Sequence, residues 1–396
     1  MTRPQREPRA AAPPTRKQLG AWYTPPELVA AVVAEAVFPG ARSALDPACG
    51  DGRFLQATGL ADQTGVDIDP ATPFIHDDSL LRDWHGRQFD VVIGNPPFLN
   101  QLARATSRGG RSRYGGGPYA DAAAEFLALS MRLARPGGRV GLVLPQSLLA
   151  ARDAAPIRTL VDGMAALRWM WWSDQLHFDA NVRVWAGVWE VGGTPGPVRR
   201  AFGPAFEERP PMPMPRHWSS LMTGGAEPDA DATAGPTVGD IATFTSDFRD
   251  QYYGLVGAVG DDLDGPPLIT SGLIDPRRCH WGERSVRFAK QRYDAPRVAL
   301  DRLSPALQKW ARARLVPKIL VANQTRVIEA VHDTAGVWLP AVPVITCVTA
   351  EPERVMDTLC SPAATRFVHD RAAGSGLAAG TVRLSPRLLA TVPLLS

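Results

Sequence analysis

The stretch FDVVIGNPPFLN, residues 89–100, joins an apolar run to a polar, proline-rich segment. Phe89 to Ile93 has the continuous apolar pattern of a strand buried on both faces of a parallel sheet. Gly94 and Asn95 end that run, and the two prolines that follow have no N–H to donate to a neighbouring strand. The backbone after Asn95 is therefore stiff, locally extended and rich in free carbonyl groups. Because open α/β sheets bind ligands beyond the carboxyl ends of their strands, this segment is a candidate binding site.

Other short apolar segments alternate with helical ones through the first half of the chain. Alternation of this kind predicts a parallel sheet covered by helices, and hence an α/β fold. Two Trp-rich segments then resemble an antiparallel pair that closes the sheet. The expected strands lie near residues 44–46, 64–69, 89–95 and 138–146, followed by the closing pair at 167–174 and 182–191.

The chain of 396 residues is longer than one typical domain, so we expect two. Residues 1–18 are basic and Pro-rich without periodicity, and are predicted to be a disordered tail. Residues 19–206 form the first predicted domain. A stretch rich in Pro, Gly and acidic residues, 207–236, is predicted to be a linker, and residues 237–396 a smaller second domain.

Composition excludes several classes of protein. Apolar residues make up 45% of the chain and charged residues 21%, without an apolar run of membrane-spanning length. The basic N-terminus has no apolar signal region, so we expect a cytoplasmic protein. The four cysteines lack zinc-ligand spacing and indicate no disulfide framework, and we expect no metal site.

Positive charge is concentrated in two places. Residues 277–318 contain twelve Lys or Arg against three acidic residues, a local net charge of +9, so the rest of the chain carries −6. Residues 101–120 contain four arginines, several glycines and no acid, which predicts a mobile basic loop next to the NPPF segment. Either cluster fits a phosphate-binding face, although a solvated surface is the alternative for a charge cluster alone.

The segment LDPACGDGRFL, residues 45–55, follows the first expected strand. Gly50 and Gly52 let the backbone turn tightly and approach a ligand, and Asp46 can accept from a cationic or hydroxyl group. Asp67 comes 21 residues after Asp46, at the next strand end, where a carboxylate can bind both hydroxyls of a ribose. A nucleoside cofactor is thus indicated. The full GxGxxG pattern and a Walker lysine are both missing, so neither NAD nor ATP fits well.

A third acidic position follows in HDDSL, residues 76–80, where Asp77 or Asp78 could accept from an adenine amino group. Each of these aspartates, taken singly, is as readily explained as a turn or cap residue. Together with Asn95, however, they fall at or just after consecutive strand ends. That order along one sheet edge indicates a shared site.

Four segments carry a family resemblance: YTPPELV (23–29), LDPACGDGRFL (45–55), GVDID (65–69) and VVIGNPPF (91–98). Their order resembles that of amino-group DNA methyltransferases of the gamma arrangement, which make N6-methyladenine from S-adenosylmethionine. The match spans about residues 19–190. The second half is similar, less specifically, to the target-recognition domains of that family in PLITSGLID (267–275), PKILVA (317–322) and GTVRLSPRLLATVPL (380–394).

The resemblance implies a Rossmann-like class I methyltransferase domain with a mostly parallel seven-stranded sheet, followed by a smaller mixed α+β recognition domain. It implies S-adenosylmethionine as cofactor and double-stranded DNA as partner. The implied cofactor-binding residues are Thr24, Asp46, Pro47, Ala48, Cys49, Gly50, Asp67, Asp78 and Pro97. The implied catalytic residues are Asn95, Pro96 and Phe98, with Phe98 and Phe178 stacking on the target base. Candidate DNA-binding residues are Arg104, Arg108, Arg111, Arg113, Arg277, Arg278, Arg284 and Arg287. The chain departs from the family at Asp51, where a serine or small residue is usual, and its recognition half is shorter than many.

Chemistry gives the NPPF segment a reason. Adenine N6 is a poor nucleophile because its lone pair is delocalised into the ring. The Asn95 side-chain oxygen and the Pro96 carbonyl can accept from the N6 hydrogens and draw the nitrogen toward a tetrahedral geometry. Phe98 offers a face on which a base flipped out of the duplex can stack.

Three other functions remain open at this stage. Segments of the NPP type also serve enzymes that methylate protein glutamine side chains or exocyclic amines in RNA. The chain could also be a catalytically silent DNA-binding subunit. A second domain with a basic block favours a long nucleic acid. We find no second set of acidic and lysine residues typical of a nuclease, so a separate restriction or defence partner would supply any DNA cleavage.

Overall fold

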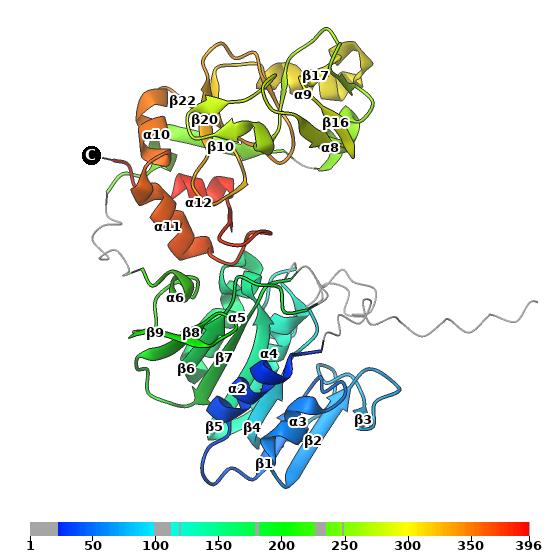
Figure 1. The fold of residues 1–396 in the computed structure, drawn as a ribbon, viewed down its shortest axis with the longest axis vertical. Coiled ribbons are helices and arrows are strands. Elements are labelled where there is room, and N and C mark those ends of the chain that lie inside the picture. Colours follow the sequence, from blue (N-terminus) through cyan, green and yellow to red (C-terminus); the bar gives the residue numbers. More distant parts are fainter. Residues whose placement is uncertain are drawn as a thin grey trace, which may run out of the picture. The chain divides into compact units, whose positions relative to one another are not determined.

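A computed structural model of the chain describes residues 23–98, 112–118, 120–178, 182–225, 235–247 and 249–395. The chain divides into two compact units between Met214 and Pro215. This boundary lies inside the stretch that the sequence predicted to be a linker. Each unit has its own buried core. Figure 1 shows the helices and strands of each unit.

The first unit is built around one sheet with helices packed against it. Its helices are α2 (Pro26–Ala36), α3 (Arg53–Thr58), α4 (Ala122–Leu133) and α5 (Ala155–Met164). Its strands are β1 (Ser43–Asp46), β2 (Asp62–Asp67), β3 (Ile75–His76), β4 (Phe89–Gly94), β5 (Ala134–Pro145), β6 (Ala165–Trp172), β7 (Val184–Val191), β8 (Val198–Phe202) and β9 (Glu207–Met212).

The strand order of this sheet is β3-β2-β1-β4-β5-β7-β6-β8-β9. Strands β1 to β5 pair in parallel, and β7 runs antiparallel to both of its neighbours, β5 and β6. The order reverses between β1 and β4, so the carboxyl ends of these two strands lie at the switch point where doubly wound sheets bind ligands. The predicted closing antiparallel pair is therefore confirmed in β6 and β7.

Two details of the sheet differ from the sequence-based expectation. The sheet has nine strands rather than seven, because β8 pairs with β6 and β9 extends the edge. Residues 207–212 of the predicted linker form β9. This Pro-rich segment can pair because β9 is the edge strand, where prolines are tolerated, and the Pro210 carbonyl accepts from the Arg200 guanidinium at 2.7 Å.

Helix α2 shows why the first unit packs as it does. Its buried residues are Leu28, Val29, Val32 and Ala36, at helical spacing, and they join the core formed by β1, β4 and β7. The helix begins at Pro26 with Pro25 as N-cap and no side-chain cap. Proline at the first position suits a helix start because its missing N–H would have no partner there.

The second unit is built from smaller sheets and short helices. A four-stranded antiparallel sheet has the order β10-β22-β18-β20, and five two-stranded sheets surround it. The strands are β10 (Ala242–Ser246), β11 (Val259–Gly260), β12 (Leu268–Ile269), β13 (Ile274–Asp275), β14 (Arg278–Cys279), β15 (Val286–Phe288), β16 (Gln291–Tyr293), β17 (Arg297–Val298), β18 (Lys318–Val321), β19 (Gln324–Thr325), β20 (Ala330–Asp333), β21 (Leu339–Pro340), β22 (Ile345–Thr349) and β23 (Val382–Arg383). The helices are α6 (Ser220–Thr223), α7 (Val238–Ile241), α8 (Arg249–Leu255), α9 (Pro305–Arg314), α10 (Pro352–Leu359), α11 (Pro362–Ala372) and α12 (Pro386–Ala390).

Part of the predicted linker also belongs to this second unit. Trp218 is buried, and the hydroxyls of Ser219 and Ser220 donate to the Asp370 carbonyl of α11 at 2.5 and 2.9 Å. Composition alone did not indicate these anchors, because one buried tryptophan is enough to fix a short, otherwise polar segment.

Candidate cofactor and base site

Asp46 ends β1 and is the most buried carboxyl of the candidate site, at 1% exposure. Its Oδ1 accepts from the Ala48 N–H at 3.0 Å, which closes the turn that begins the glycine loop. Burial, reinforced by the nearby charges of Asp67 and Asp51, raises the pKa of Asp46 to about 8 against the lowering effect of the Ala48 N–H. A buried carboxyl of this kind is ready to take up a cationic partner.

Asp67, at the end of β2, organises the glycine loop from the other side. One carboxylate oxygen accepts from Gly50 N–H at 2.7 Å and the other from Asp69 N–H at 2.9 Å. A carboxylate has about four acceptor positions, so two remain for the vicinal hydroxyls of a ribose. Gly50 and Gly52 both have positive φ, which glycine adopts without strain.

Phe74 is a contributor that sequence reasoning missed. Its ring packs so closely that a Cβ added at Gly52 would overlap it, and one added at Gly65 would lie 2.7 Å from it. The two glycines therefore admit an aromatic ring between the loop and β2. No motif marks Phe74, because the contact depends on how residues 65 and 74 come together in the fold.

Cys49 can line the site, as predicted, through its backbone and the volume of its side chain, without a reactive thiol. The thiol is buried at 5% exposure, and its Sγ lies 3.9 Å from the Thr72 hydroxyl. Burial, then the charges of Asp46 and Asp67, raise the pKa of Cys49 to about 12. This thiol stays protonated near neutral pH and is no nucleophile.

Thr24 is buried beside the glycine loop, just before the N-cap residue of α2, Pro25. Its carbonyl accepts from Arg53 Nη1 at 2.6 Å, and the same guanidinium pairs with Asp51 at 2.6 Å and lies over the Tyr23 ring. Asp51, the residue at which the chain departs from the family pattern, therefore helps to hold the 23–24 segment against the loop.

Asp78 lies in a turn after β3. Its Oδ1 accepts from Leu80 N–H at 2.9 Å, and neighbouring Asp77 pairs with Arg82 at 2.7 Å. The turn alternative considered for an isolated aspartate thus describes part of what this side chain does.

Gly94 lies where the end of β4, which leads into the NPPF segment, contacts the end of β1, which leads into the glycine loop. Strands β1 and β4 pair in parallel, and a Cβ added at Gly94 would lie 2.8 Å from the carboxyl carbon of Asp46. Real Cβ atoms do not approach other heavy atoms this closely, so glycine lets the two strand ends meet. Asn95 and Pro96 follow directly, and Pro96 is buried.

Replacing Gly94 with alanine should therefore disturb both the packing of the two strand ends and the binding of the cofactor. The added methyl overpacks against a carboxyl held by the Ala48 N–H, which typically costs about 1–3 kcal/mol. We expect a lower midpoint of thermal unfolding and weaker cofactor binding by calorimetry. Gly163→Ala in α5 is the matched control, because no atom lies within 4 Å of its added Cβ. Equal midpoints for Gly94→Ala and wild type would contradict this packing argument.

Two aromatic rings are in contact at the end of the NPPF segment. Phe98 follows Pro97, and Phe178 follows β6, yet their ring centroids lie 6.2 Å apart at an interplanar angle of 71°. Both rings are half-buried and pack against the core of the first unit. The resemblance implied that Phe178 stacks on the target base; its ring contacts Phe98 and also packs against the core of the first unit.

The basic loop is represented by its last residues. Arg104, Arg108 and Arg111 lie outside the described residues. Arg113 donates to the Leu80 carbonyl through its side chain and to buried Glu125 of α4 through its N–H, at 3.0 Å for the latter. Within the described residues of this loop, the Ser112 hydroxyl and the Arg113 N–H both donate to Glu125, so intramolecular contacts hold this part of the predicted mobile loop to α4.

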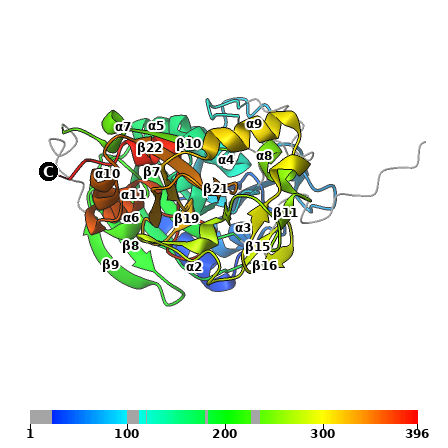
Figure 2. The ribbon, with the colours of Figure 1, turned by 90° about the horizontal axis from the view of Figure 1, so that it is seen from above.

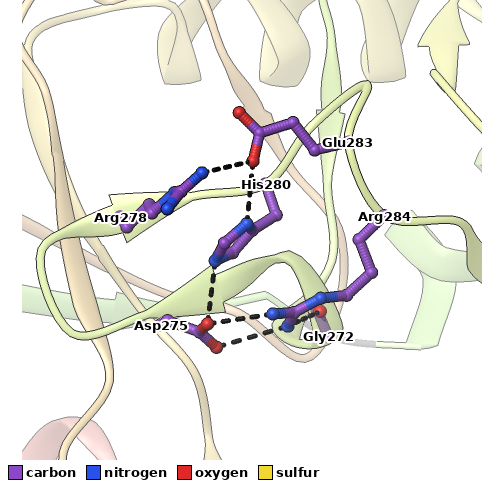
Figure 3. A network of polar contacts seen from close by, with 6 residues as sticks. All are labelled: Gly272, Asp275, Arg278, His280, Glu283 and Arg284. Carbon is purple, nitrogen blue, oxygen red and sulfur yellow. Dashed lines mark hydrogen bonds and ion pairs between the residues drawn. The ribbon is translucent and has the colours of Figure 1, made fainter.

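The predicted DNA-binding arginines of the second unit differ in their surroundings. Arg278 pairs with Glu283 at 2.8 Å and Arg284 with Asp275 at 2.9 Å, and His280 bridges both carboxylates (Figure 3). Arg277 pairs with Asp357. Arg287 is exposed on β15. Charge in the first three is thus largely balanced within the fold, which the count of basic residues did not reveal.

In the described part of the chain, no helix is long and apolar enough to cross a membrane. The same residues contain no group of three His, Cys, Asp or Glu side chains arranged to hold a metal ion.

The sheet order, with its antiparallel β7 and the acidic residues at the ends of β1 and β2, defines a Rossmann-like methyltransferase fold. Residues 59–167 match the family model of the Eco57I restriction-modification methylase. The Type II methyltransferase M.TthHB8I of Thermus thermophilus is 30% identical in a match that covers 38% of this chain and 40% of that protein.

Two solved structures extend the comparison. The Type IIL restriction-modification enzyme MmeI, in complex with DNA, is similar over 87% of this chain and 61% of its own, with a TM-score of 0.54 and 10% identity. The type IIG restriction endonuclease BpuSI is similar over 96% of this chain and 58% of its own, with a TM-score of 0.40 and 11% identity. The likeness to MmeI is one of fold.

These findings confirm the resemblance and the fold class drawn from the motifs. Within the first unit, residues 59–167 are similar to the Eco57I restriction-modification methylase, and the sheet around them has a Rossmann-like methyltransferase topology. The match to the curated relative spans 40% of that protein's length, less than two thirds.

Proposed function

We propose that this protein is a site-specific DNA adenine methyltransferase that transfers the methyl group of S-adenosylmethionine to N6 of a flipped adenine. Its biological setting would be restriction-modification, phage defence or epigenetic marking. The observation that carries the proposal is the direct contact of two strand ends at Gly94: the Asp46 carboxyl of the cofactor loop lies against the backbone from which Asn95 and Pro96 continue.

The residues present fit the cofactor. Asp67 has acceptor positions left for a ribose, and Asp46 is a buried carboxyl that a cationic amino acid moiety would favour in its ionised form. Thr24, Cys49 and Pro97 would line the site, and Asp78 would accept from the adenine amino group. When bound, S-adenosylmethionine supplies an electrophilic methyl group on a sulfonium centre.

Asn95 and Pro96 would act on the substrate base. The Asn95 amide oxygen and the Pro96 carbonyl each accept one N6 hydrogen, which holds the nitrogen with its lone pair directed away from the ring plane. Such acceptors cost no reorganisation because the following prolines fix the backbone. The proton can leave after methyl transfer, so the arrangement requires no buried general base.

Phe98 and Phe178 would hold the flipped base. Their present edge-to-face arrangement brings the rings 6.2 Å apart at 71°, an attractive geometry without a base. A base stacked on Phe98 needs a spacing of about 3.5 Å from that ring. Phe178 must therefore turn or withdraw as the base enters, and the contact energy of the aromatic pair is exchanged for stacking on the base.

The second unit favours DNA over the alternative substrates. It holds the whole basic block of residues 277–318, and a long nucleic acid is the partner that needs such a surface. A protein glutamine or an RNA amine could use the same NPPF segment, so the substrate class has to be measured.

The test is incubation of the purified protein with labelled S-adenosylmethionine and, in separate reactions, unmethylated DNA, RNA and a protein mixture. We expect label in DNA, and mass spectrometry of the digested nucleosides should identify N6-methyladenine. Label in RNA or protein, or in a different base, would overturn the proposal. Sequencing the methylated DNA would then identify the recognised site.

A further inference from the structure

The β15–β16 hairpin of the second unit has an unusual distribution of charge. Val286 and Phe288 of β15 are buried, whereas Arg287 between them is exposed. Phe288 pairs with Gln291, so a two-residue turn, Ala289 and Lys290, connects the strands. Both strands are labelled in Figure 2. The alternation anchors one face of the hairpin in the core and presents the other face to solvent.

The exposed face brings like charges together. Arg287 lies directly opposite Arg292 in the register, and both side chains are exposed. Arg292 Nε donates to the neutral Ser285 hydroxyl at 2.9 Å, which leaves its charge unbalanced. Like charges directly opposite each other on one face destabilise a strand pair. With exposed Lys290 at the turn, the hairpin carries three cations and, among described residues, no ion-pair partner for them.

The turn is also unfavourable by itself. Ala289 and Lys290 have φ of 48° and 68°, although a turn of this type strongly favours Asn-Gly. Contacts with Tyr252 hold the turn in this conformation. The Ala289 N–H donates to the Tyr252 hydroxyl at 3.2 Å, and the Tyr252 and Phe288 ring centroids lie 5.0 Å apart. A strained turn held firmly in place is a feature that clusters at functional sites.

Six of the nine other cations of the basic block are treated differently, whereas Arg302, Lys309 and Arg312 are exposed and, like the hairpin cations, have no ion pair with a described residue. Carboxylates balance five of them in the fold: Arg277, Arg278, Arg284, Arg314 and Lys318. Arg297 instead lies over the Trp281 ring. The hairpin thus keeps its positive charge available while much of the surrounding block does not.

We propose that the β15–β16 hairpin is a phosphate-binding element of this protein, with Arg287, Lys290 and Arg292 contacting the backbone of a DNA duplex. The inference rests on the proposed function and deepens it, because it names the residues that hold the long substrate. A phosphate between Arg287 and Arg292 relieves their repulsion, and a two-stranded ribbon has the dimensions to enter a major groove. Arg278 and Arg284, by contrast, remain in their internal ion pairs.

The experiment compares two triple variants of the full chain. One removes the hairpin cations, Arg287→Gln with Lys290→Gln and Arg292→Gln. The matched control removes three exposed cations of the same unit at and near α9, Arg302→Gln with Lys309→Gln and Arg312→Gln. Both lose the same charge. The affinity for a fluorescent DNA duplex of mixed sequence is measured across a range of salt concentrations, together with thermal unfolding.

We expect the hairpin variant to flatten the dependence of log affinity on log salt by about 0.9 per lost phosphate contact, or about 2.7 for three. The control should retain a slope close to that of wild type. The thermal midpoint of the hairpin variant should be equal to or above that of wild type, because opposed like charges are removed. A purely structural role for these side chains predicts a lower midpoint instead.

Equal losses of slope in the two variants would show an effect of net charge and overturn the assignment, as would a wild-type slope in the hairpin variant. Both results leave the proposed function intact if the wild-type protein binds the duplex and methylates DNA. A wild-type protein that shows no salt-dependent binding to DNA would instead refute the DNA substrate itself.

Discussion

Asn95→Ala should abolish most methyl transfer while cofactor binding persists. The substitution removes one of the two acceptors proposed for N6, and loss of one preorganised hydrogen bond of this kind costs on the order of 3 kcal/mol, a hundredfold or more in rate. The measurement is single-turnover methyl transfer to DNA, with S-adenosylmethionine affinity determined in parallel by calorimetry. Turnover near that of wild type would contradict the assignment of Asn95 as an acceptor for adenine N6.

A conservative variant separates chemistry from folding. Asn95→Asp keeps an acceptor oxygen at the same place, so it should retain more activity than Asn95→Ala with a similar thermal midpoint. If the two variants lose activity equally, the acceptor is not what the reaction requires, and the contribution of Asn95 would be to shape the turn before Pro96.

Asp46→Asn should make the free protein more stable at alkaline pH and weaken cofactor binding. Burial raises the pKa of Asp46 to about 8, above its value in the unfolded chain, so the folded state keeps the proton between about pH 4 and 8. Stability therefore falls as pH rises through that window, and the cost is fully present above the folded pKa. At 1.36 kcal/mol per unit of pKa, the shift from 3.8 to about 8 sets an upper limit of roughly 6 kcal/mol. Asparagine stays neutral and still accepts from Ala48.

The test combines stability and binding over pH. The midpoints of the variant and wild type should converge near pH 4 and diverge near pH 8, with the variant higher. Wild-type affinity for S-adenosylmethionine should increase by up to about tenfold per unit between pH 6 and 7 as Asp46 ionises, below the usual α-amino pKa of about 8. Variant affinity should be weaker and nearly flat. Parallel pH profiles for the two proteins would place the cationic end of the cofactor elsewhere.

Asp46 and the β15–β16 hairpin both contain charge arrangements that lower the stability of the free protein. The Asp46 carboxyl is buried without an ion pair to any described residue, and Arg287 and Arg292 lie opposite each other without an ion pair to any described carboxylate. Each arrangement is unfavourable in the free protein and becomes favourable when a charged ligand arrives. We expect substitutions at both places to raise stability and lower binding, which is the usual sign of a functional site.

Local sequence determined much of the first unit. The apolar run before Gly94 and the aspartates at residues 46 and 67 predicted both a parallel sheet and the edge at which ligands bind, because strand ends and glycine turns depend on neighbouring residues. The edge strand β9 was missed for the opposite reason: prolines argue against a strand unless its position at the sheet edge is known.

Tertiary structure alone decided which charges and rings meet. The sequence counted twelve cations between residues 277 and 318, but it could not distinguish those paired with distant carboxylates, such as Arg314 with Asp247, from those left exposed, such as Arg287. It also could not bring Phe178 to Phe98 or Phe74 to Gly52. Such contacts join residues far apart in the chain, and their geometry follows from how whole strands and helices pack rather than from any local pattern.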